Sequence, residues 1–123
     1  MALSEAKLAS LSSVASAGSA TYTCPASKNA YIRSIIVCNV TNASSTAVNT
    51  GNPNTVSIHF VDSGGTASDS NRIARFSIVA DDTFFFEPEY PITLDAGDFI
   101  TVKNEGSPGS NSITVTFCGD VTT

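Results

Sequence analysis

Closely spaced turn signals divide this sequence into short segments, and that spacing is what most restricts the possible folds. Clusters rich in Gly, Pro, Asn, Asp and Ser separate the apolar runs, as in "SGGTASDSN", "LDAGD" and "EGSPGSN". Such clusters form turns because Gly adopts positive φ, as we expect of Gly97 in "LDAGD", and because Asp and Asn bond to nearby backbone groups. No segment between Thr21 and the end of the chain has the period of a core helix. The pattern predicts an all-β domain.

The segment "AYIRSIIVCNVT" predicts a long strand that is covered on both sides, because it is apolar on both faces. On strict alternation, one face holds Ile32, Ile36, Cys38 and Val40, and the other holds Ile35 and Val37. The cleanest alternation is in "TVSIHFVD". There we expect Val56, Ile58 and Phe60 to point inward, and Ser57 and His59 to point to solvent.

These segments together predict seven or eight short strands in residues 21–123. In the last strand, Ile113, Val115 and Phe117 are expected to face the core. Strands with one apolar face are stable when two sheets pack together. We therefore expect one β-sandwich or jelly-roll-like domain, and 123 residues are enough for one domain.

Residues 1–20 differ from the rest, because Ala and Ser dominate and the apolar side chains are few. These few are Leu3, Leu8, Leu11 and Val14. The spacing of the last three fits a narrow helical stripe, which would not hold a helix in isolation. We expect an N-terminal arm, partly helical or extended, whose four apolar residues contact a partner. The domain division is then 1–20 for the arm and 21–123 for the sandwich.

The charge pattern restricts the partners. Only 14% of the residues are charged, and 11 Asp and Glu against 6 Lys and Arg give a net charge of −5. Nucleic-acid binding needs clustered Lys and Arg, so we expect no nucleic-acid partner. No apolar run is long enough for a membrane span or a signal peptide, so we expect neither. A surface poor in charge suits a protein that packs against neighbours.

The three cysteines, Cys24, Cys38 and Cys118, raise the question of a metal site, a disulfide or a nucleophile. Zinc needs four ligands, whereas the chain has one histidine, His59, and no C-x-x-C. We interpret Cys38 as a core residue and Cys118 as a strand residue on the face opposite Phe117. A Cys24–Cys38 or Cys24–Cys118 bridge stays open, because spacing alone does not establish one.

No catalytic signature stands out. His59 is the only imidazole that could activate a nucleophile, and no nucleophile elbow or phosphate-binding loop is present. The Asp and Glu residues occur at turns, without calcium-loop spacing. We expect no enzyme activity, no catalytic residue, no cofactor and no metal. A glycosidase is the enzymatic alternative, because paired carboxylates can cleave glycosides.

The segment "TFFFEPEYP" places three consecutive Phe residues in one strand, so at least one ring lies on each face. Either both faces are covered or one ring is exposed as an interface anchor. We take Phe84, Phe86 and Tyr90 as candidate interface residues and leave the choice between core and interface open.

From Thr21 onward the chain resembles small β-sandwich virion proteins of tailed bacteriophages. The resemblance is carried by "YTCPASKNAYIRSIIVCNVTN", "SIHFVDSGGTASDSNRI", "PITLDAGDFITVK" and "ITVTFCGD". The matching features are Tyr22 with Pro25, Val37 with Asn39, Gly64 with Gly65, and the turn from Leu94 to Asp98. These are structural turns rather than catalytic motifs. Neither the cysteines nor the arm matches a group pattern.

The resemblance implies a non-enzymatic virion protein. Our first hypothesis is a capsid decoration or cement protein that binds the major capsid protein on the outer lattice and forms a homotrimer. It would lie on the virion surface after synthesis in the host cytoplasm. The second hypothesis is a tail- or fibre-associated module that binds a host glycan.

Overall fold

The computed structural model describes residues 3–14, 18–40, 53–106 and 112–122. Within them the strands are β1 Leu3–Val14, β2 Ser19–Thr23, β3 Ala30–Asn39, β4 Asn54–Val61, β5 Arg72–Ile78, β6 Thr83–Phe86, β7 Ile92–Leu94, β8 Phe99–Gly106 and β9 Ile113–Thr122. A single 3₁₀ turn, η1 at Asp69–Asn71, completes this described set. The predicted all-β fold is confirmed, and the strand beyond the expected eight is β1.

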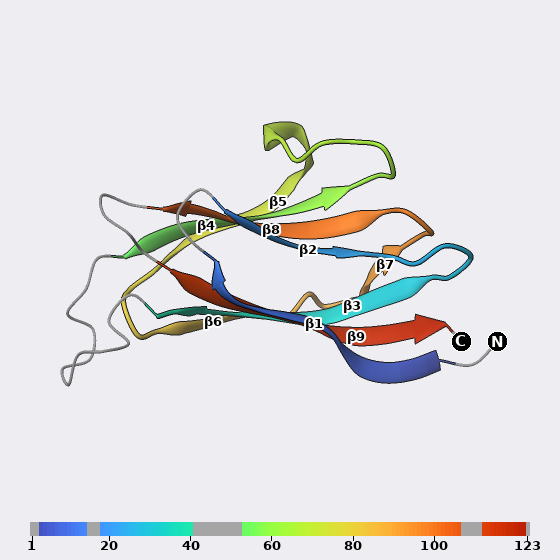
Figure 1. Cartoon of the computed structure of the whole chain (residues 1–123), viewed down its shortest axis with the longest axis horizontal. Coiled ribbons are helices and arrows are strands. Elements are labelled where there is room, and N and C mark those ends of the chain that lie inside the picture. The colour runs from blue at the N-terminus through green and yellow to red at the C-terminus, as the bar shows by residue number, and fades with distance from the viewer. Residues whose placement is uncertain (1–2, 15–17, 41–52, 107–111, 123) are drawn as a thin grey trace.

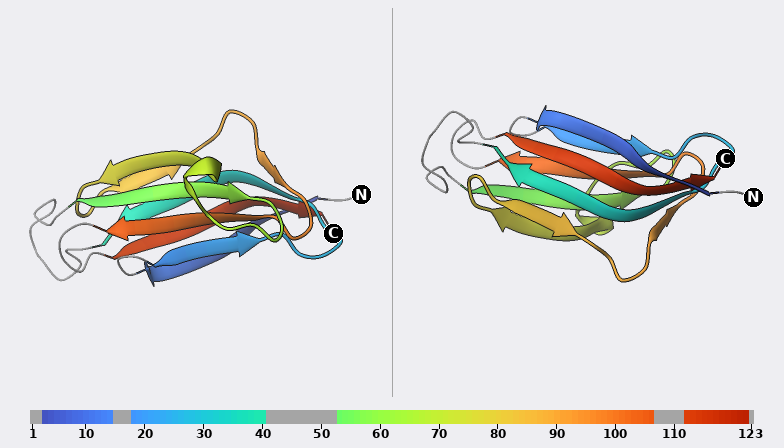
Figure 2. Two further views of the ribbon diagram at one scale, coloured as in Figure 1. Left: turned by 90° about the horizontal axis from the view of Figure 1, so that it is seen from above. Right: turned by 90° about the horizontal axis from the view of Figure 1, so that it is seen from below.

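The strands form two antiparallel sheets that pack face to face (Figure 1). Sheet A has the order β1-β9-β3-β6, and β7 pairs with β3 beyond the end of β6. Sheet B has the order β2-β8-β4-β5. Seen from above and from below, the two sheets run along each other over most of their length (Figure 2). This is the β-sandwich predicted from the turn spacing.

The core lies between the sheets and is built by alternate residues of the central strands. As expected, Ile113, Val115 and Phe117 of β9 face inward and are fully buried. Val56 and Ile58 of β4 meet them from sheet B, whereas Phe60 is only partly buried against this core. Burial of one such aliphatic or aromatic side chain contributes about 1.5–3 kcal/mol.

A β-bulge in β3 makes the predicted face of Ile32 wrong. Its pairing with β9 shifts between Ile32 and Ser34, so that Arg33 is the extra residue. The shift places Ile32 on the buried face with Ile35 and Val37, whereas strict alternation predicted that it shared a face with Ile36. The one-residue insertion reverses the alternation at that point.

The predicted exposure of Ser57 and His59 is wrong. Both point away from the core as expected, yet both are buried, because the loop of residues 62–71 folds over the outer face of sheet B. Figure 1 shows η1 above β4 and β5, on the side of sheet B away from sheet A. Strand alternation predicts the face of a residue but not what covers that face.

The predicted arm lies in sheet A. β1 pairs antiparallel with β9 from Leu3 to Val14, so the segment is an extended edge strand here rather than a helix. Val14 belongs to the core cluster, and Leu8 packs against it half-buried. The side chains of Leu3 and Leu11 lie outside the described part of the structure. The division of the chain at residue 20 stays a prediction.

The turn at Asp95–Asp98 connects the two sheets rather than forming a hairpin, since β7 belongs to sheet A and β8 to sheet B. Gly97 has a φ of 88°, as the sequence predicted. The Asp98 carboxylate accepts hydrogen bonds from the backbone N–H groups of Asp95 and Ser63, both at 3.0 Å. Asp98 thus ties this turn to the loop that follows β4.

Candidate functional site

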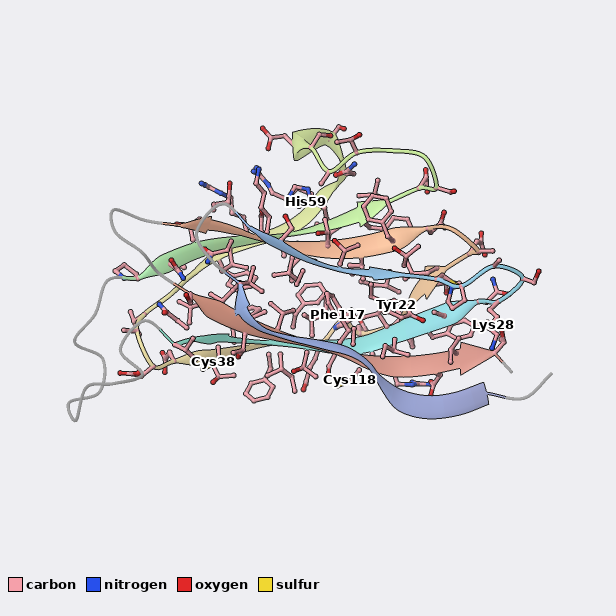
Figure 3. The ribbon with its side chains drawn as sticks, viewed as in Figure 1. Tyr22, Lys28, Cys38, His59, Phe117 and Cys118 are labelled. Atoms are coloured by element: carbon pink, nitrogen blue, oxygen red, sulfur yellow. The ribbon has the colours of Figure 1, made fainter. Side chains whose placement is uncertain are left out.

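The three cysteines are free thiols in three different positions. Cys24 is buried, and its Sγ lies 3.3 Å from the carbonyl oxygen of Lys28. Burial raises the pKa of the Cys24 thiol. Cys38 and Cys118 are half-buried on the outer face of sheet A, where Figure 3 shows both below Phe117. The prediction that Cys38 lies in the core is therefore wrong, whereas the predicted placement of Cys118 on the face opposite Phe117 is confirmed.

His59 is held by three hydrogen-bonding groups under the loop of residues 62–71. Its Nδ1 lies 2.9 Å from the Ser68 carbonyl oxygen and 3.1 Å from the Asn71 side-chain oxygen. Its Nε2 lies 3.0 Å from the Ser57 hydroxyl. Because both groups facing Nδ1 are acceptors, the proton lies on Nδ1, and Nε2 accepts the Ser57 hydroxyl hydrogen.

The Ser57–His59 pair has the spacing of an activated nucleophile, but its position prevents access. Ser57 is 1% exposed and His59 is 4% exposed, so the hydroxyl that would attack is not accessible to a substrate. Asn71 also donates to the Thr66 carbonyl and accepts from the Ser68 N–H, at 2.8 and 2.9 Å. This network holds the loop on sheet B.

Apart from Val61 and Phe99, which pair at one end of it, the rest of the outer face of sheet B is mainly polar. The Thr21 and Thr101 hydroxyls lie 2.8 Å apart, and Arg75 Nε donates to Glu105 at 2.9 Å. Lys103 is exposed beside these pairs. The polar side chains of this face therefore bond to one another or to solvent.

Across β3, β6 and β9, the outer face of sheet A carries a different surface, which we call the uncharged face; β1, in which Lys7 is in register with Cys118, is not part of it. Directly paired residues of antiparallel strands point to the same side, so the register identifies its members. They are Ser34, Ile36 and Cys38 of β3, Thr83 and Phe85 of β6, and Thr114, Thr116 and Cys118 of β9. All eight are exposed or half-buried. At one end of this face, Arg33 pairs with the buried carboxylate of Asp120.

A second surface follows β5, β6 and the chain after them, and we call residues 73–90 the edge segment. Every exposed large apolar side chain of the described residues belongs to it, namely Ile73, Val79, Phe85 and Tyr90. β5 and β6 are the edge strands on the same side of sheets B and A, and the stacked rings of Phe76 and Phe84 join them at 3.9 Å between centroids. The edge segment also carries Asp81, Asp82, Glu87 and Glu89, and no Lys or Arg after Arg75.

The predicted interface residues divide between core and surface. Phe84 and Phe86 pack against the core, half-buried, as do Leu8 and the more deeply buried Val14. Tyr90 is 76% exposed. The exposed ring of the triple-Phe strand is Phe85, at 58% exposure. Strand alternation places Phe85 opposite Phe84 and Phe86, but it does not predict which of the two faces is exposed.

Metal-binding and membrane-spanning features are absent from the described ranges. No group of three His, Cys, Asp or Glu residues lies close enough there to hold a metal ion, and no pocket is present among them. No helix in the described part is long and apolar enough to cross a membrane.

Comparisons with known proteins identify no family. No family model matches the chain, and no curated protein matches it. Among solved structures, PirA is similar with a TM-score of 0.44 and 13% identity, covering 94% of this chain and 92% of PirA.

Two longer proteins also show similarity. The CBM22-1–GH10 modules of xylanase 10B from Clostridium thermocellum give a TM-score of 0.42 at 11% identity, covering 99% of this chain and 24% of theirs. Hydroquinone 1,2-dioxygenase from Sphingomonas sp. TTNP3 gives a TM-score of 0.34 at 8% identity, covering 83% of this chain and 57% of the dioxygenase chain. At these TM-scores the similarities carry no argument about this chain.

Proposed function

We propose that this protein is a non-enzymatic structural protein of a tailed-phage virion, and that it decorates and stabilises the outer capsid lattice. The observation that carries the proposal is the edge segment, which lies along one side of the sandwich and holds every exposed large apolar side chain of the described residues. The phage class itself rests on the sequence resemblance.

The edge segment has the composition of a docking surface. Tyr90 and Phe85 offer aromatic rings, which are enriched at the centres of protein interfaces. The edge segment also carries the exposed carboxylates of Asp82, Glu87 and Glu89. Charge complementarity then favours a capsid surface that presents an apolar depression with Lys or Arg at its rim.

Virion stoichiometry tests the proposal directly. In gel densitometry of purified virions, a decoration protein gives hundreds of copies per particle. A few copies per particle would contradict the capsid role and favour the tail- or fibre-associated alternative. The exposed ring of Tyr90 suits that alternative too, because sugars stack on aromatic faces.

Binding to undecorated capsids tests the surface. We expect Tyr90→Ala to weaken binding by about 2 kcal/mol, or about thirtyfold in Kd, if the ring is a central anchor. Glu87→Gln combined with Glu89→Gln should also weaken it and reduce its salt dependence. Asp62→Asn with Asp69→Asn removes the same charge from the loop over sheet B and serves as the matched control. Equal effects of both pairs would contradict a role for the edge segment.

A further inference from the structure

We infer that β1 binds the β1 strand of a second copy of this chain, and that the two strands pair antiparallel about a two-fold axis at Ala6. The inference does not depend on the proposed function, because it needs no capsid. It rests on the open edge of β1 and on the order of the charged residues along this strand.

β1 is the longest edge strand of the sandwich. It spans Leu3–Val14 and pairs with β9 on one side, and no described strand pairs with its other side. The other edge strands offer less: β2 and β6 have five and four residues, and β5 is interrupted by a bulge at Ile73. The open side of β1 presents backbone N–H and C=O groups to which another strand can bond.

Two features of β1 restrict which strand can pair with it. Edge lysines and β-bulges prevent unselective pairing between edge strands, and β1 has Lys7 and a register shift directly after it. A second shift follows Leu11. A partner strand therefore has to be short, and it has to place an acidic residue opposite Lys7.

The sequence of β1 itself meets this requirement. Glu5 and Lys7 lie on either side of Ala6. When two copies run antiparallel about Ala6, Glu5 of each copy is opposite Lys7 of the other. Opposite charges at directly paired positions favour the pairing, and like charges oppose it. A pair centred on Glu5 or on Lys7 would place like charges opposite each other, so the order of charges selects one register.

The charges of the rest of the chain favour a contact on this side. Each copy carries a net charge of −5, so many contacts between copies would bring carboxylates together. β1 and β2 lie along one side of the sandwich, away from β5 and β6 (Figure 2). Glu5 and Lys7 are the only charged residues in these two strands, whereas the edge segment carries four acidic residues. A two-fold contact here uses the same segment of both copies and closes on itself.

The expected association is weak. The pairing joins sheet A of the two copies into one sheet, but the register shift after Lys7 limits it to about five residues of each copy. Few backbone hydrogen bonds then form between the copies. We expect a dimer that is visible at high protein concentration and reversible on dilution.

Charge reversal tests the pairing and its register together. Glu5→Lys places lysines opposite each other, and Lys7→Glu places glutamates opposite each other. We expect each variant alone to raise the dimer Kd by at least about tenfold in sedimentation equilibrium. An equimolar mixture of the two variants should associate again, because every lysine then meets a glutamate. The double variant Glu5→Lys with Lys7→Glu should dimerise like the wild type for the same reason.

Two controls match the changes in net charge. Lys28→Glu and Glu89→Lys alter exposed residues outside β1, and both should dimerise like the wild type. Circular dichroism shows whether each variant is folded. The rescue by the mixture separates lost pairing from lost folding, because an unfolded chain would not be rescued by a second variant.

Cross-linking tests the position of the axis. Ala6→Cys should give a disulfide-linked dimer under mild oxidation, because residue 6 lies opposite its own copy. Peptide mass spectrometry should find the new thiol joined to its own copy. Ser77→Cys, exposed on β5, is the control and should not give this dimer.

A wild type that stays monomeric at its highest soluble concentration would overturn the inference. So would a trimer, a mixture of the two charge variants that does not associate, or an Ala6→Cys chain that does not cross-link to its own copy.

Discussion

The two outer faces of the sandwich are built by the same alternation, yet they end in opposite situations. On sheet B, the outward residues Ser57 and His59 are buried, because the loop of residues 62–71 covers them and supplies hydrogen-bond partners. On sheet A, the outward residues Ile36, Cys38 and Phe85 are half-buried or exposed, and no described segment covers them. The polar groups of the covered face of sheet B are thus bonded within the chain, whereas the uncharged face of sheet A is left open.

This difference indicates on which face of the sandwich a partner is expected to bind. A polar face that bonds to its own loop gains little from a partner, because its groups are already paired. An uncharged face with an exposed aromatic ring gains by leaving water. Changes on sheet B should therefore affect folding and the covering loop, whereas surface changes on sheet A should affect association.

The largest effect is expected at the bulge of sheet A, where Gly119 of β9 lies against the backbone of β3. A Cβ atom at Gly119 would lie 1.9 Å from the Tyr31 carbonyl oxygen, which is backbone and cannot move aside cheaply. We expect Gly119→Ala to lower the free energy of unfolding by about 3 kcal/mol in urea denaturation.

The matched glycine on the other side is Gly64, in the loop over sheet B. It has a φ of +82°, and a Cβ atom added there would have no neighbouring atom within 4 Å, so Gly64→Ala introduces only backbone strain. We expect a cost of about 1 kcal/mol. If the two variants were equally destabilised, the close approach at Gly119 would not be a special constraint.

The second largest effect on stability is expected where the loop of residues 62–71 covers sheet B. His59→Ala removes the ring that bonds to Ser57, Ser68 and Asn71, and it leaves their polar atoms without that partner. We expect a loss of about 2–3 kcal/mol in unfolding free energy. Limited proteolysis should then cut residues 62–71 faster than in the wild type. Unchanged stability and cleavage would show that the loop is held by other contacts.

The sequence predicted the architecture because turn residues and alternation are local signals. It placed Phe117, Val115 and Ile113 in the core and Gly97 in a left-handed turn, as the structure has them. It failed where a non-local event decides the outcome. The bulge at Arg33 changes the face of Ile32, and the cover over His59 comes from a loop that the alternation of β4 does not describe.

The candidate surfaces were only partly predictable for the same reason. The triple-Phe strand signalled that rings lie on both faces, and Tyr90 was recognised as an interface candidate. Which ring is exposed depends on which side of β6 faces sheet B, and that is fixed by its pairing with β3. The pairing of β1 with β9 was missed, because Ala and Ser at edge positions give a weak strand signal.

The third effect is a difference in how much two ion pairs, one on each outer face, contribute to the free energy of unfolding. Asp120 on sheet A has a side chain that is 1% exposed, whereas Glu105 on sheet B is 27% exposed. Asp120→Asn should cost about 1–2 kcal/mol, because a buried charged hydrogen bond is lost while Arg33, 54% exposed, can turn to solvent. Glu105→Gln should cost about 0–1 kcal/mol. Urea midpoints of the two variants give the comparison, and equal midpoints would contradict it.

The smallest effect lies at Cys24, which belongs to neither outer face and closes the end of the sandwich beside the inter-sheet turn. The Cys24 N–H donates to the Asp98 carbonyl, and the Gly97 N–H donates to the Cys24 carbonyl, at 2.9 and 3.0 Å. Burial raises the pKa of its thiol, and the charges of Asp98 and Asp95 add to this. Burial also raises the pKa of Tyr22.

The sign of the pH dependence follows from the direction of the pKa shift. Below the ordinary thiol pKa, both the folded and unfolded chains are protonated at Cys24, so its contribution to stability is complete. Above that pKa the unfolded chain loses the proton first, so folding stability falls as the pH rises toward the higher folded pKa. One group contributes at most about 1.4 kcal/mol per pH unit.

Urea midpoints measured in reductant between about pH 7 and pH 10 test this expectation, because the pKa of an unperturbed thiol, about 8.5, lies inside that range. The wild type should lose stability across that range, and Cys24→Ala should lose less, whatever its stability at neutral pH. Tyr22→Phe is the companion variant, because it removes the half-buried phenol hydroxyl at this end and leaves the thiol in place. If Cys24→Ala and the wild type declined in parallel, the thiol would not be the group that limits stability in alkali, and the decline would belong to Tyr22 or to another group that loses its proton in alkali.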